Sequence, residues 1–369
     1  MATKQIINGR RPVNVFSTNR LEFYDLGPVT PVNSNVLLEN QNWHLCTFDF
    51  KRREAIFVRI SVGSKIYEAP FLHEELFQHA SEVMLVPLDE FLQLASQIEE
   101  PNQIIHLFSI GRCGSTLAHH LFHNAEGVLG VSEPDTYIAL TMARLELSDR
   151  FSIELLRACT RFHFLAGAKK QDHTIIVKHH SQALFMAGRV RLANPSAKFL
   201  FMTRDGESWG NSVFQMAQSF GFPVKQDRAQ REMFWYIISG GQEIETVKNI
   251  IDITDESAQA DRWIAVLWAI HMIEYMRLWN DGFKMLVINY GQLNDERLST
   301  VQRMFSYCGL RVDHLERVLS VFDNDSQAGT KLAQNRKTSS FTEKNFQNFR
   351  DTIAQFKSLS SCKLVLPSL

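Results

Sequence analysis

From Asn102 onward, short unbroken apolar runs alternate with longer stretches in which apolar residues recur every three or four positions. An unbroken run is typical of a strand buried on both faces, and the longer spacing is typical of an amphipathic helix. The alternation therefore predicts an α/β fold, a parallel sheet flanked by helices, with strands at residues 104–109, 174–178, 198–203 and 285–289. Helices are expected at residues 114–124, 152–166, 183–193, 206–218, 228–251, 259–279, 298–308, 313–321 and 342–356.

The first hundred residues follow a different pattern. Residues 1–40 show no sustained periodicity, whereas residues 43–50, 56–62 and 65–69 resemble strands of a small antiparallel meander. Short helices are expected at 73–79 and 88–98, around a strand at 83–86. The segment EEPN at 99–102 is a plausible boundary. We therefore expect two domains, an N-terminal β-rich α+β region of unknown role over residues 1–100 and an α/β domain over residues 101–369.

Composition restricts the partners. The net charge of -1 gives no sign of a nucleic-acid partner, so any basic site has to be local. The five cysteines are scattered without a CxxC pair, which favours neither a disulfide framework nor a zinc cluster and indicates a reducing compartment. The N-terminus lacks an apolar signal-peptide core, and His271, Glu274 and Arg277 interrupt the most apolar helical stretch. We expect a cytoplasmic protein without a membrane span.

A loop follows the first strand of the predicted parallel sheet. Gly111 and Gly114 supply backbone freedom, Ser115 and Thr116 supply hydroxyls, and apolar residues at helical spacing come next. A strand, a glycine-containing loop and a helix together aim backbone N–H groups and the positive end of a helix dipole at one spot. The arrangement predicts a site for a phosphate-sized anion.

The loop fails two common tests for nucleotide sites. A Walker loop needs a lysine after its last glycine, but residues 109–116 read SIGRCGST, with Arg112 before Gly114 instead. The GxGxxG pattern of dinucleotide folds is also missing.

The loop does resemble that of the P-loop sulfotransferases, which carry a basic residue, a small residue, glycine and two hydroxyls after a buried strand; here these are Arg112, Cys113, Gly114, Ser115 and Thr116. A second match supports the resemblance, because Arg204 directly follows a predicted strand and Ser212 lies two helical turns further on, at the family spacing. A guanidinium and a hydroxyl suit a dianionic phosphate, and charge-assisted hydrogen bonds contribute roughly 1.5–3 kcal/mol each.

The resemblance covers residues 104–336 and is closest in style to bacterial and to tyrosyl-protein and carbohydrate sulfotransferases. It implies a P-loop-type sheet and the donor 3′-phosphoadenosine 5′-phosphosulfate (PAPS), which leaves as PAP. Glu133 falls where relatives carry the general base, Lys178 resembles the lysine that touches the transferring sulfuryl group, and Tyr290 resembles a tyrosine near the adenine. Residues 325–337 resemble a loop that covers the donor.

The sequence departs from the family at two points. Cys113 replaces the more usual serine, and His179 and His180 follow Lys178 where relatives often have an acidic residue and proline. Either histidine is an alternative base to Glu133. These departures put the identity of the acceptor in doubt more than that of the donor.

Structural alternatives exist for each candidate. Glu133 could serve as a carboxylate at a helix start, and Lys178 could be a strand-end lysine that reaches solvent. Cys113 could be an oxidation-sensitive thiol, although a small residue that fits the loop is the commoner case. His119 and His123 are one helical turn apart but lack an evident third ligand, so no metal site is expected.

These patterns together predict a sulfotransferase that moves a sulfuryl group from PAPS to a hydroxyl or amine acceptor without a metal. The acceptor could be a small molecule, a carbohydrate, a lipid headgroup or a peptide, and the N-terminal strands could contribute to the acceptor pocket or to a homodimer. Two alternatives remain, a nucleotide-binding protein without turnover and a metal-dependent phosphotransferase, for which Asp205 would be the magnesium carboxylate.

Overall fold

The structure is a computed structural model, and it describes residues 1–12, 20–61, 64–219, 232–233, 235–236, 239, 250–251, 260–311, 315–323, 325–326 and 340–356. Most of the helix predicted at 228–251 lies outside the described residues. Residues 327–337 of the predicted donor-covering loop lie outside them as well.

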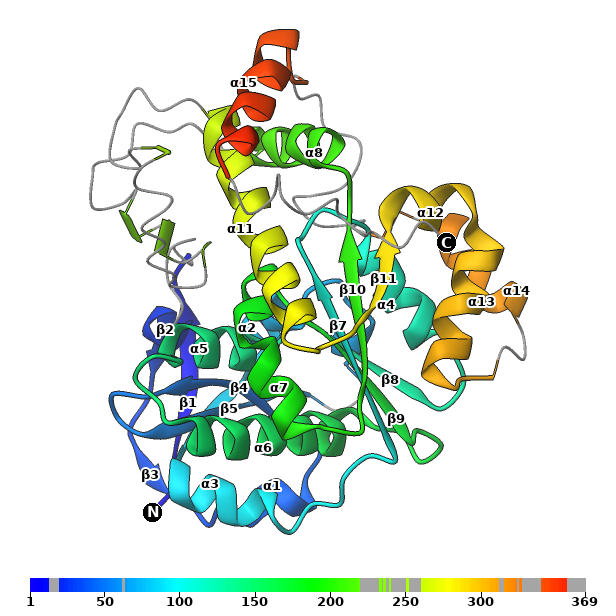
Figure 1. The fold of residues 1–369 in the computed structure, drawn as a ribbon. Coiled ribbons are helices and arrows are strands. Elements are labelled where there is room, and N and C mark those ends of the chain that lie inside the picture. The colour runs from blue at the N-terminus through cyan, green and yellow to red at the C-terminus, as the bar shows by residue number, and fades with distance from the viewer. Residues whose placement is uncertain are drawn as a thin grey trace. The chain divides into compact units, whose positions relative to one another are not determined.

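The prediction of a parallel sheet is confirmed. Five strands form it in the order β11-β10-β7-β9-β8 (Figure 1). They are β7 (Gln103–Ser109), β8 (Val128–Ser132), β9 (Thr174–Lys178), β10 (Lys198–Thr203) and β11 (Leu286–Asn289). Every residue of β8 and β9 is buried, and only the first residues of β7 and β10 are partly exposed, as unbroken apolar runs require. The short strand β8 was not predicted.

The chain divides into two compact units, which we describe separately. The first unit comprises Met1–His106 and Phe122–Lys198, and the second comprises Leu107–Leu121 and Phe199–Leu369.

The first unit contains a six-stranded sheet with the order β2-β1-β6-β5-β4, and β3 pairs with β1. Its pairings are antiparallel, and the strands are β1 (Thr3–Arg10), β2 (Tyr24–Leu26), β3 (Thr30–Pro31), β4 (Trp43–Asp49), β5 (Glu54–Arg59) and β6 (Glu82–Pro87). The strands predicted near β4, β5 and β6 are therefore confirmed. β1 was not predicted, because its segment TKQIINGR carries only two apolar residues.

One predicted strand in this region is wrong. Residues 66–68 form the 3-10 helix η2 (Ile66–Glu68), in which Ile66 is buried. The main-chain N–H of Glu68 donates to the carbonyl of Lys65 at 3.0 Å, and the two side chains form an ion pair at 3.1 Å. Contacts across three residues favour a helical turn over an extended strand.

Helices and a phenylalanine cluster complete the first unit. The helices are α1 (Val36–Glu39), α2 (Leu72–His79), α3 (Leu88–Ala95), α5 (Asp135–Ala143), α6 (Asp149–Gly167), η3 (Ser181–Met186) and α7 (Ala187–Ala193), with η1 at Arg20–Phe23. Phe162 of α6 lies 5.0 Å from both Phe57 and Phe91, measured between ring centroids. These rings join β5, α3 and α6 in one core.

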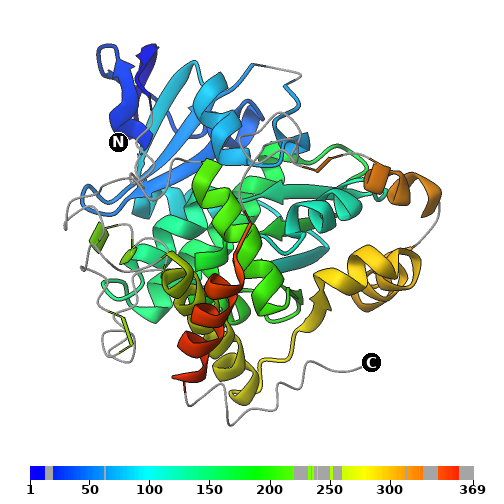
Figure 2. The ribbon, with the colours of Figure 1, turned by 90° about the horizontal axis from the view of Figure 1, so that it is seen from above.

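Helices close to the predicted bounds lie in the second unit or, for the first of them, extend two residues beyond it. They are α4 (Ser115–His123), α8 (Gly206–Ser219), α11 (Ala260–Asn280), α13 (Arg297–Cys308), α14 (Leu315–Leu319) with η4 (Ser320–Asp323), and α15 (Glu343–Ala354). The short helix α12 (Tyr290–Asp295) was not predicted. Helices α8, α11 and α15 pack together, as the views in Figures 1 and 2 show. A Cβ atom at Gly210 would lie 2.9 Å from the ring of Phe349, so glycine permits this close approach.

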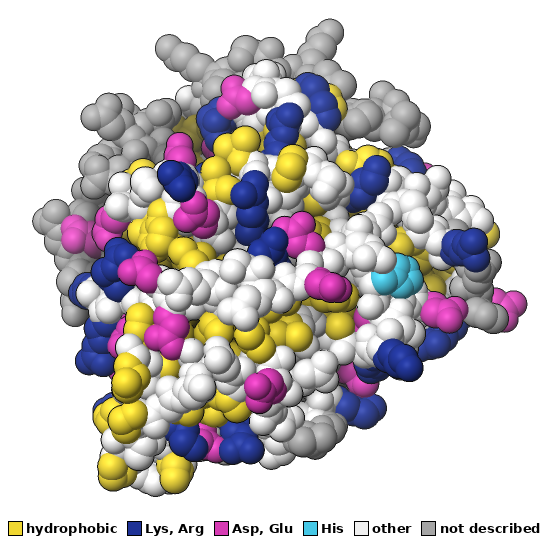
Figure 3. All heavy atoms as spheres, turned by 90° about the horizontal axis from the view of Figure 1, so that it is seen from below, with side chains coloured by type: hydrophobic (Ala, Val, Ile, Leu, Met, Phe, Trp, Pro, Cys, Tyr) yellow, Lys and Arg dark blue, Asp and Glu magenta, His cyan; other side chains and the backbone are white. Residues whose placement is uncertain are grey.

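The exterior agrees with the near-zero net charge. Basic and acidic side chains are interspersed on the face drawn in Figure 3. Among the helices in the described part of the chain, none combines the length and the apolar character that a membrane span requires.

Candidate functional site

The loop between β7 and α4 has an unusual backbone. Gly111, Arg112 and Gly114 have φ values of 70°, 46° and 81°. A residue with a Cβ atom adopts this left-handed conformation at a cost of roughly 1–2 kcal/mol, so contacts around Arg112 have to hold it there. A left-handed residue next to one of ordinary φ turns successive main-chain N–H groups toward a common point, as in an anion-binding nest, and Gly114 follows Cys113, which is not left-handed.

Contacts from neighbouring strands and helices hold the loop. Trp209 of α8 donates its Nε1–H to the carbonyl of Gly111 at 2.8 Å. Cys113 is fully buried, and its thiol donates to the carbonyl of Met202 in β10 at 3.4 Å. Cys113 therefore fills the loop as a small residue. Ser115 and Thr116 begin α4 and are also buried.

Gly114 lies against the ring of Tyr290. A Cβ atom built on Gly114 would be 2.7 Å from Tyr290 Cδ2, which is closer than a carbon contact allows. Parallel pairing of β10 and β11 sets Thr203 opposite Asn289, so the residues that follow, Arg204 and Tyr290, leave the two strands side by side. The Arg204 guanidinium accordingly lies over the Tyr290 ring, 4.7 Å from its centroid.

The two predicted phosphate-binding arginines lie together. Arg112 donates from Nε to Ser212 Oγ at 3.2 Å, and Arg204 donates to the carbonyl of Arg112 at 3.4 Å. Burial, and then the positive charge of Arg204, lower the pKa of Arg112. The fold thus holds two repelling cations together, an arrangement that a bound anion stabilises. We call Arg112, Gly114, Arg204, Ser212 and Tyr290 the loop cluster.

Ser208 of α8 contacts Arg204 and is itself held by Asp205, which directly precedes the helix. Arg204 donates from Nε to Ser208 Oγ at 2.9 Å, a contact that the sequence pattern did not reveal. Asp205 Oδ1 accepts from the main-chain N–H of Ser208 at 3.0 Å, so this carboxylate caps the start of α8. The alternative role of Asp205 as a magnesium ligand has no support from this contact.

In the first unit, Glu133 and Lys178 are brought together by strand pairing. β8 and β9 are parallel neighbours with Ser132 opposite Lys178, and Glu133 directly follows β8. Lys178 Nζ lies 2.5 Å from Glu133 Oε1, and the lysine side chain is 1% exposed. Lys178 therefore does not extend into solvent, and its ammonium group lies 5.3 Å from the centroid of the Phe71 ring.

Glu133 is held as a charged carboxylate. Burial by itself would raise its pKa, but Lys178, His180 and His73 outweigh burial and hold the pKa below its ordinary value. Its φ of 52° is left-handed, and the cap of α5 is Pro134 without a side-chain bond. The side chain is 17% exposed.

The two candidate histidines have different environments. His180 Nδ1 lies 3.2 Å from Glu133 Oε2. His179 is fully buried, with its Nε2 atom 2.9 Å from His106 Nδ1, and burial lowers its pKa well below the ordinary value. Asn194 donates to His106 Nε2 at 3.3 Å, so the proton of His106 lies on Nδ1 and is donated to His179. His179 belongs to this buried chain of contacts in the first unit.

Sequence reasoning missed two residues near Glu133. His73 of α2 lies with its Nδ1 atom 2.9 Å from the main-chain oxygen of Glu133, and Asp135 Oδ1 lies 3.7 Å from His180 Nε2. No local pattern pointed to His73, because it is 60 positions from Glu133 in the chain. We call Glu133, Lys178, His180, His73 and Asp135 the carboxylate cluster.

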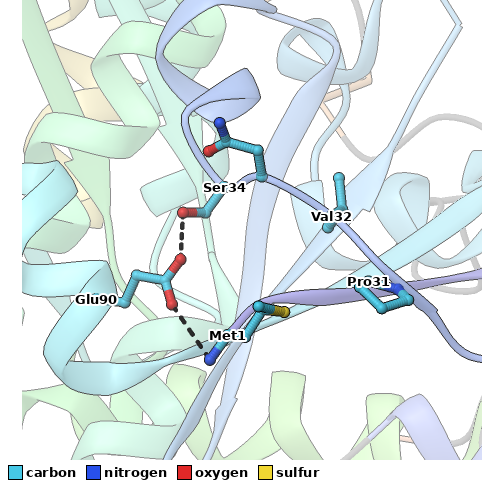
Figure 4. Close-up of a pocket in the computed structure, with 6 residues that line it drawn as sticks. Met1, Pro31, Val32, Ser34 and Glu90 are labelled. Atoms are coloured by element: carbon cyan, nitrogen blue, oxygen red, sulfur yellow. Dashed lines mark hydrogen bonds and ion pairs between the residues drawn. The ribbon is translucent and has the colours of Figure 1, made fainter.

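Two surface hollows contain none of the predicted site residues. The hollow in Figure 4 has a volume of about 440 Å³ and lies beside Met1, whose ammonium group is 3.7 Å from Glu90 Oε2. Ser34 donates to the same carboxylate of Glu90. The other hollow, of about 830 Å³, borders the C-terminal end of α6 and residues 168–172. Both belong to the first unit, and neither adds a group to the two clusters.

No protein-family model and no curated protein sequence matches the chain. Among solved structures it is similar to a mouse sulfotransferase complexed with PAP, at 14% identity and a TM-score of 0.38, covering 72% of this chain and 88% of that one. A Mycobacterium tuberculosis sulfotransferase aligns at 12% identity and a TM-score of 0.41, covering 71% and 82%. The sulfotransferase domain of a Synechococcus olefin synthase aligns at 12% identity and a TM-score of 0.36, covering 69% and 95%.

Proposed function

We propose that this protein is a PAPS-dependent sulfotransferase that transfers a sulfuryl group to a hydroxyl or amine of an acceptor. The observation that carries the proposal is the loop cluster, in which Arg112 donates to Ser212 and Arg204 donates to the carbonyl of Arg112, beside a left-handed loop. The donor carries negative charge at both its 3′-phosphate and its 5′-phosphosulfate end, so it can neutralise both cations.

Different residues of the loop cluster are proposed to bind different parts of the donor. We assign the 3′-phosphate to Arg204 and Ser212, because a guanidinium and a hydroxyl give it directed donors. The amides of residues 111–116 and the Arg112 guanidinium receive the 5′-phosphosulfate end, where negative charge grows as the bond to sulfur breaks. The Tyr290 ring, already covered on one face by Arg204, is assigned to the adenine end of the donor.

The carboxylate cluster supplies the proton chemistry. Glu133 accepts the proton of the acceptor hydroxyl, and the acceptor oxygen forms a new bond to sulfur as the bond from sulfur to the phosphate oxygen breaks. Lys178 offers positive charge to the oxygens that become more negative in this step. His180, which contacts Glu133, is the alternative base, whereas we assign no catalytic role to the buried His179.

Several finer assignments belong to the same proposal. The acceptor is a small molecule, a carbohydrate or a peptide, and residues 1–100 contribute to acceptor recognition or to a homodimer. We place the protein in the cytoplasm, a reducing compartment in which disulfides rarely form. The four described cysteines are buried and form no disulfide, which fits a reducing environment.

Calorimetric titration with PAP tests the donor site. Wild-type protein should bind PAP, and Arg204→Ala should weaken binding by roughly 10-fold or more, because it removes charge-assisted bonds that contribute about 1.5–3 kcal/mol each. Arg297→Ala is the matched control, since this arginine also lies over an aromatic ring, 4.8 Å from the centroid of Phe322. Equal PAP affinity in wild type and Arg204→Ala would refute the assignment.

A second candidate is a PAP-binding protein without turnover. It is favoured by one observation, the 2.5 Å ion pair that engages both Glu133 and Lys178. Glu133→Gln separates the candidates, because a sulfotransferase should keep PAP binding and lose turnover in this variant. If the wild type binds PAP and releases none from PAPS with any acceptor class, the second candidate holds.

A further inference from the structure

Four polar atoms of the carboxylate cluster converge in the first unit. His73 Nδ1 and His180 Nε2 lie 2.9 Å and 3.1 Å from the main-chain oxygen of Glu133. Asp135 Oδ1 lies 3.9 Å from His73 Nδ1 and 3.7 Å from His180 Nε2. One ligand atom from each of His73, Asp135 and His180 thus lies within 4.8 Å of the other two.

These separations are close to those of ligands on a small metal ion. Nitrogen and oxygen ligands bind Zn²⁺ at roughly 2.0–2.2 Å, so two ligands of a tetrahedral site are about 3.4 Å apart. The side chains of His73, Asp135 and His180 are 9%, 12% and 19% exposed, so little water competes for the ion. A shift of a few tenths of an ångström in each side chain would bring the three ligand atoms to the separations of a tetrahedral zinc site.

The surroundings orient one histidine for coordination. The main-chain oxygen of Glu133 can only accept, so without an ion His180 Nε2 and His73 Nδ1 donate to it at 3.1 Å and 2.9 Å. His180 Nδ1 lies 3.2 Å from Glu133 Oε2, so with the proton on Nδ1 it donates to this carboxylate and Nε2 is left for the ion. His73 binds the ion in the tautomer that carries its proton on Nε2. A carboxylate in this position is the usual outer partner of a metal-binding histidine. Lys178 holds the other oxygen of Glu133 and fixes the carboxylate.

The geometry points to a divalent transition-metal site formed by His73 Nδ1, His180 Nε2 and Asp135 Oδ1. Two imidazole nitrogens and one carboxylate oxygen favour Zn²⁺ and its first-row neighbours over Mg²⁺ and Ca²⁺, which prefer oxygen ligands. The site goes beyond the proposed transfer reaction and runs against the expectation of a protein without metal. A bound ion links the start of α2, the start of α5 and the segment after β9 around Glu133.

Metal titration of the full chain tests the site. Protein treated with a chelator is titrated with Zn²⁺ by calorimetry and with Co²⁺ by visible absorption. We expect one ion per chain. His73→Ala and Asp135→Asn should each weaken binding by more than about 100-fold, and Glu133→Gln, which changes only the outer partner, by about 10–100-fold.

His79→Ala is the matched control. This histidine lies on the same helix and pairs with a carboxylate, Glu75, at 3.2 Å, but it is exposed. It should leave metal binding unchanged. Failure of the wild type to bind Zn²⁺ or Co²⁺ stoichiometrically, or unchanged binding in Asp135→Asn, would overturn the inference.

X-ray absorption of the zinc-loaded wild type gives a readout that does not depend on variants folding. The site predicts a shell of nitrogen and oxygen with two imidazoles and without sulfur. A sulfur neighbour would assign the ion to a cysteine instead. Because every readout is metal binding, failure of this site is distinguishable from failure of PAP to bind.

Discussion

The ion pair between Lys178 and Glu133 makes a quantitative prediction about stability. Glu133→Gln keeps the shape of the side chain but leaves the ammonium group, on a side chain that is 1% exposed, without its counter-charge. Removing one partner of a buried ion pair costs about 3–5 kcal/mol. Deprotonating an ordinary lysine at pH 7 costs about 5 kcal/mol, which sets the upper limit of the penalty.

Removing the lysine of this ion pair should destabilise the protein less than removing the carboxylate. Lys178→Met leaves a carboxylate that is 17% exposed and still faces His180 Nδ1 at 3.2 Å. We expect a loss of about 1–3 kcal/mol. In the double variant neither charge remains. Its free energy of unfolding should therefore fall by about 2 kcal/mol less than the sum of the decreases in the two single variants.

Urea denaturation followed by circular dichroism measures these free energies. Glu68→Gln is the control, because it breaks the exposed Lys65–Glu68 pair, whose side chains are 78% and 51% exposed. That variant should lose less than about 1 kcal/mol. A loss in Glu133→Gln no larger than in Glu68→Gln, or strict additivity in the double variant, would refute the account of a buried, coupled pair.

Two further predictions concern the loop and the buried histidines. Gly114→Ala should destabilise the protein by about 2–4 kcal/mol and weaken PAP binding, because the new Cβ meets Tyr290 at 2.7 Å and φ is left-handed. Burial lowers the pKa values of His44, His106 and His163 to about 4, 3 and 3. As the pH falls below 6.5, these histidines therefore become protonated in the unfolded chain before they do so in the folded chain. Stability should fall by about 1 kcal/mol per histidine between pH 7 and 5.5, and level off below the folded pKa values.

Each of these predictions has a matched control. Gly282→Ala introduces a side chain at a φ of 80° where no atom lies within 4 Å, so it isolates backbone strain and should cost about 1–2 kcal/mol. If it costs as much as Gly114→Ala in the same urea assay, contact with Tyr290 is not the cause. For the pH effect, thermal melts of His106→Asn should show a shallower loss below pH 6.5 than wild type. An unchanged slope would contradict the role of buried neutral histidine.

The sequence by itself determined four of the five strands of the parallel sheet, all but β8, and the residues of the loop cluster. Each buried strand is a continuous apolar run, and such a run is recognisable without knowing what covers it. Arg112 and Arg204 were also found by position, because each follows a strand and parallel strands present such residues at the same edge. The prediction failed where the local signal was weak, as in the polar strand β1 and the helical turn at Ile66.

Only the tertiary structure decided the composition of the carboxylate cluster. His179 and His180 are adjacent in sequence, yet one contacts the buried His106 and the other contacts Glu133, because neighbouring residues on an extended chain point in opposite directions. His73 joins the cluster through the packing of α2, a contact between distant segments that leaves no periodic trace in the sequence. His73, His180, Asp135 and the main-chain oxygen of Glu133 come together only when those segments pack against one another.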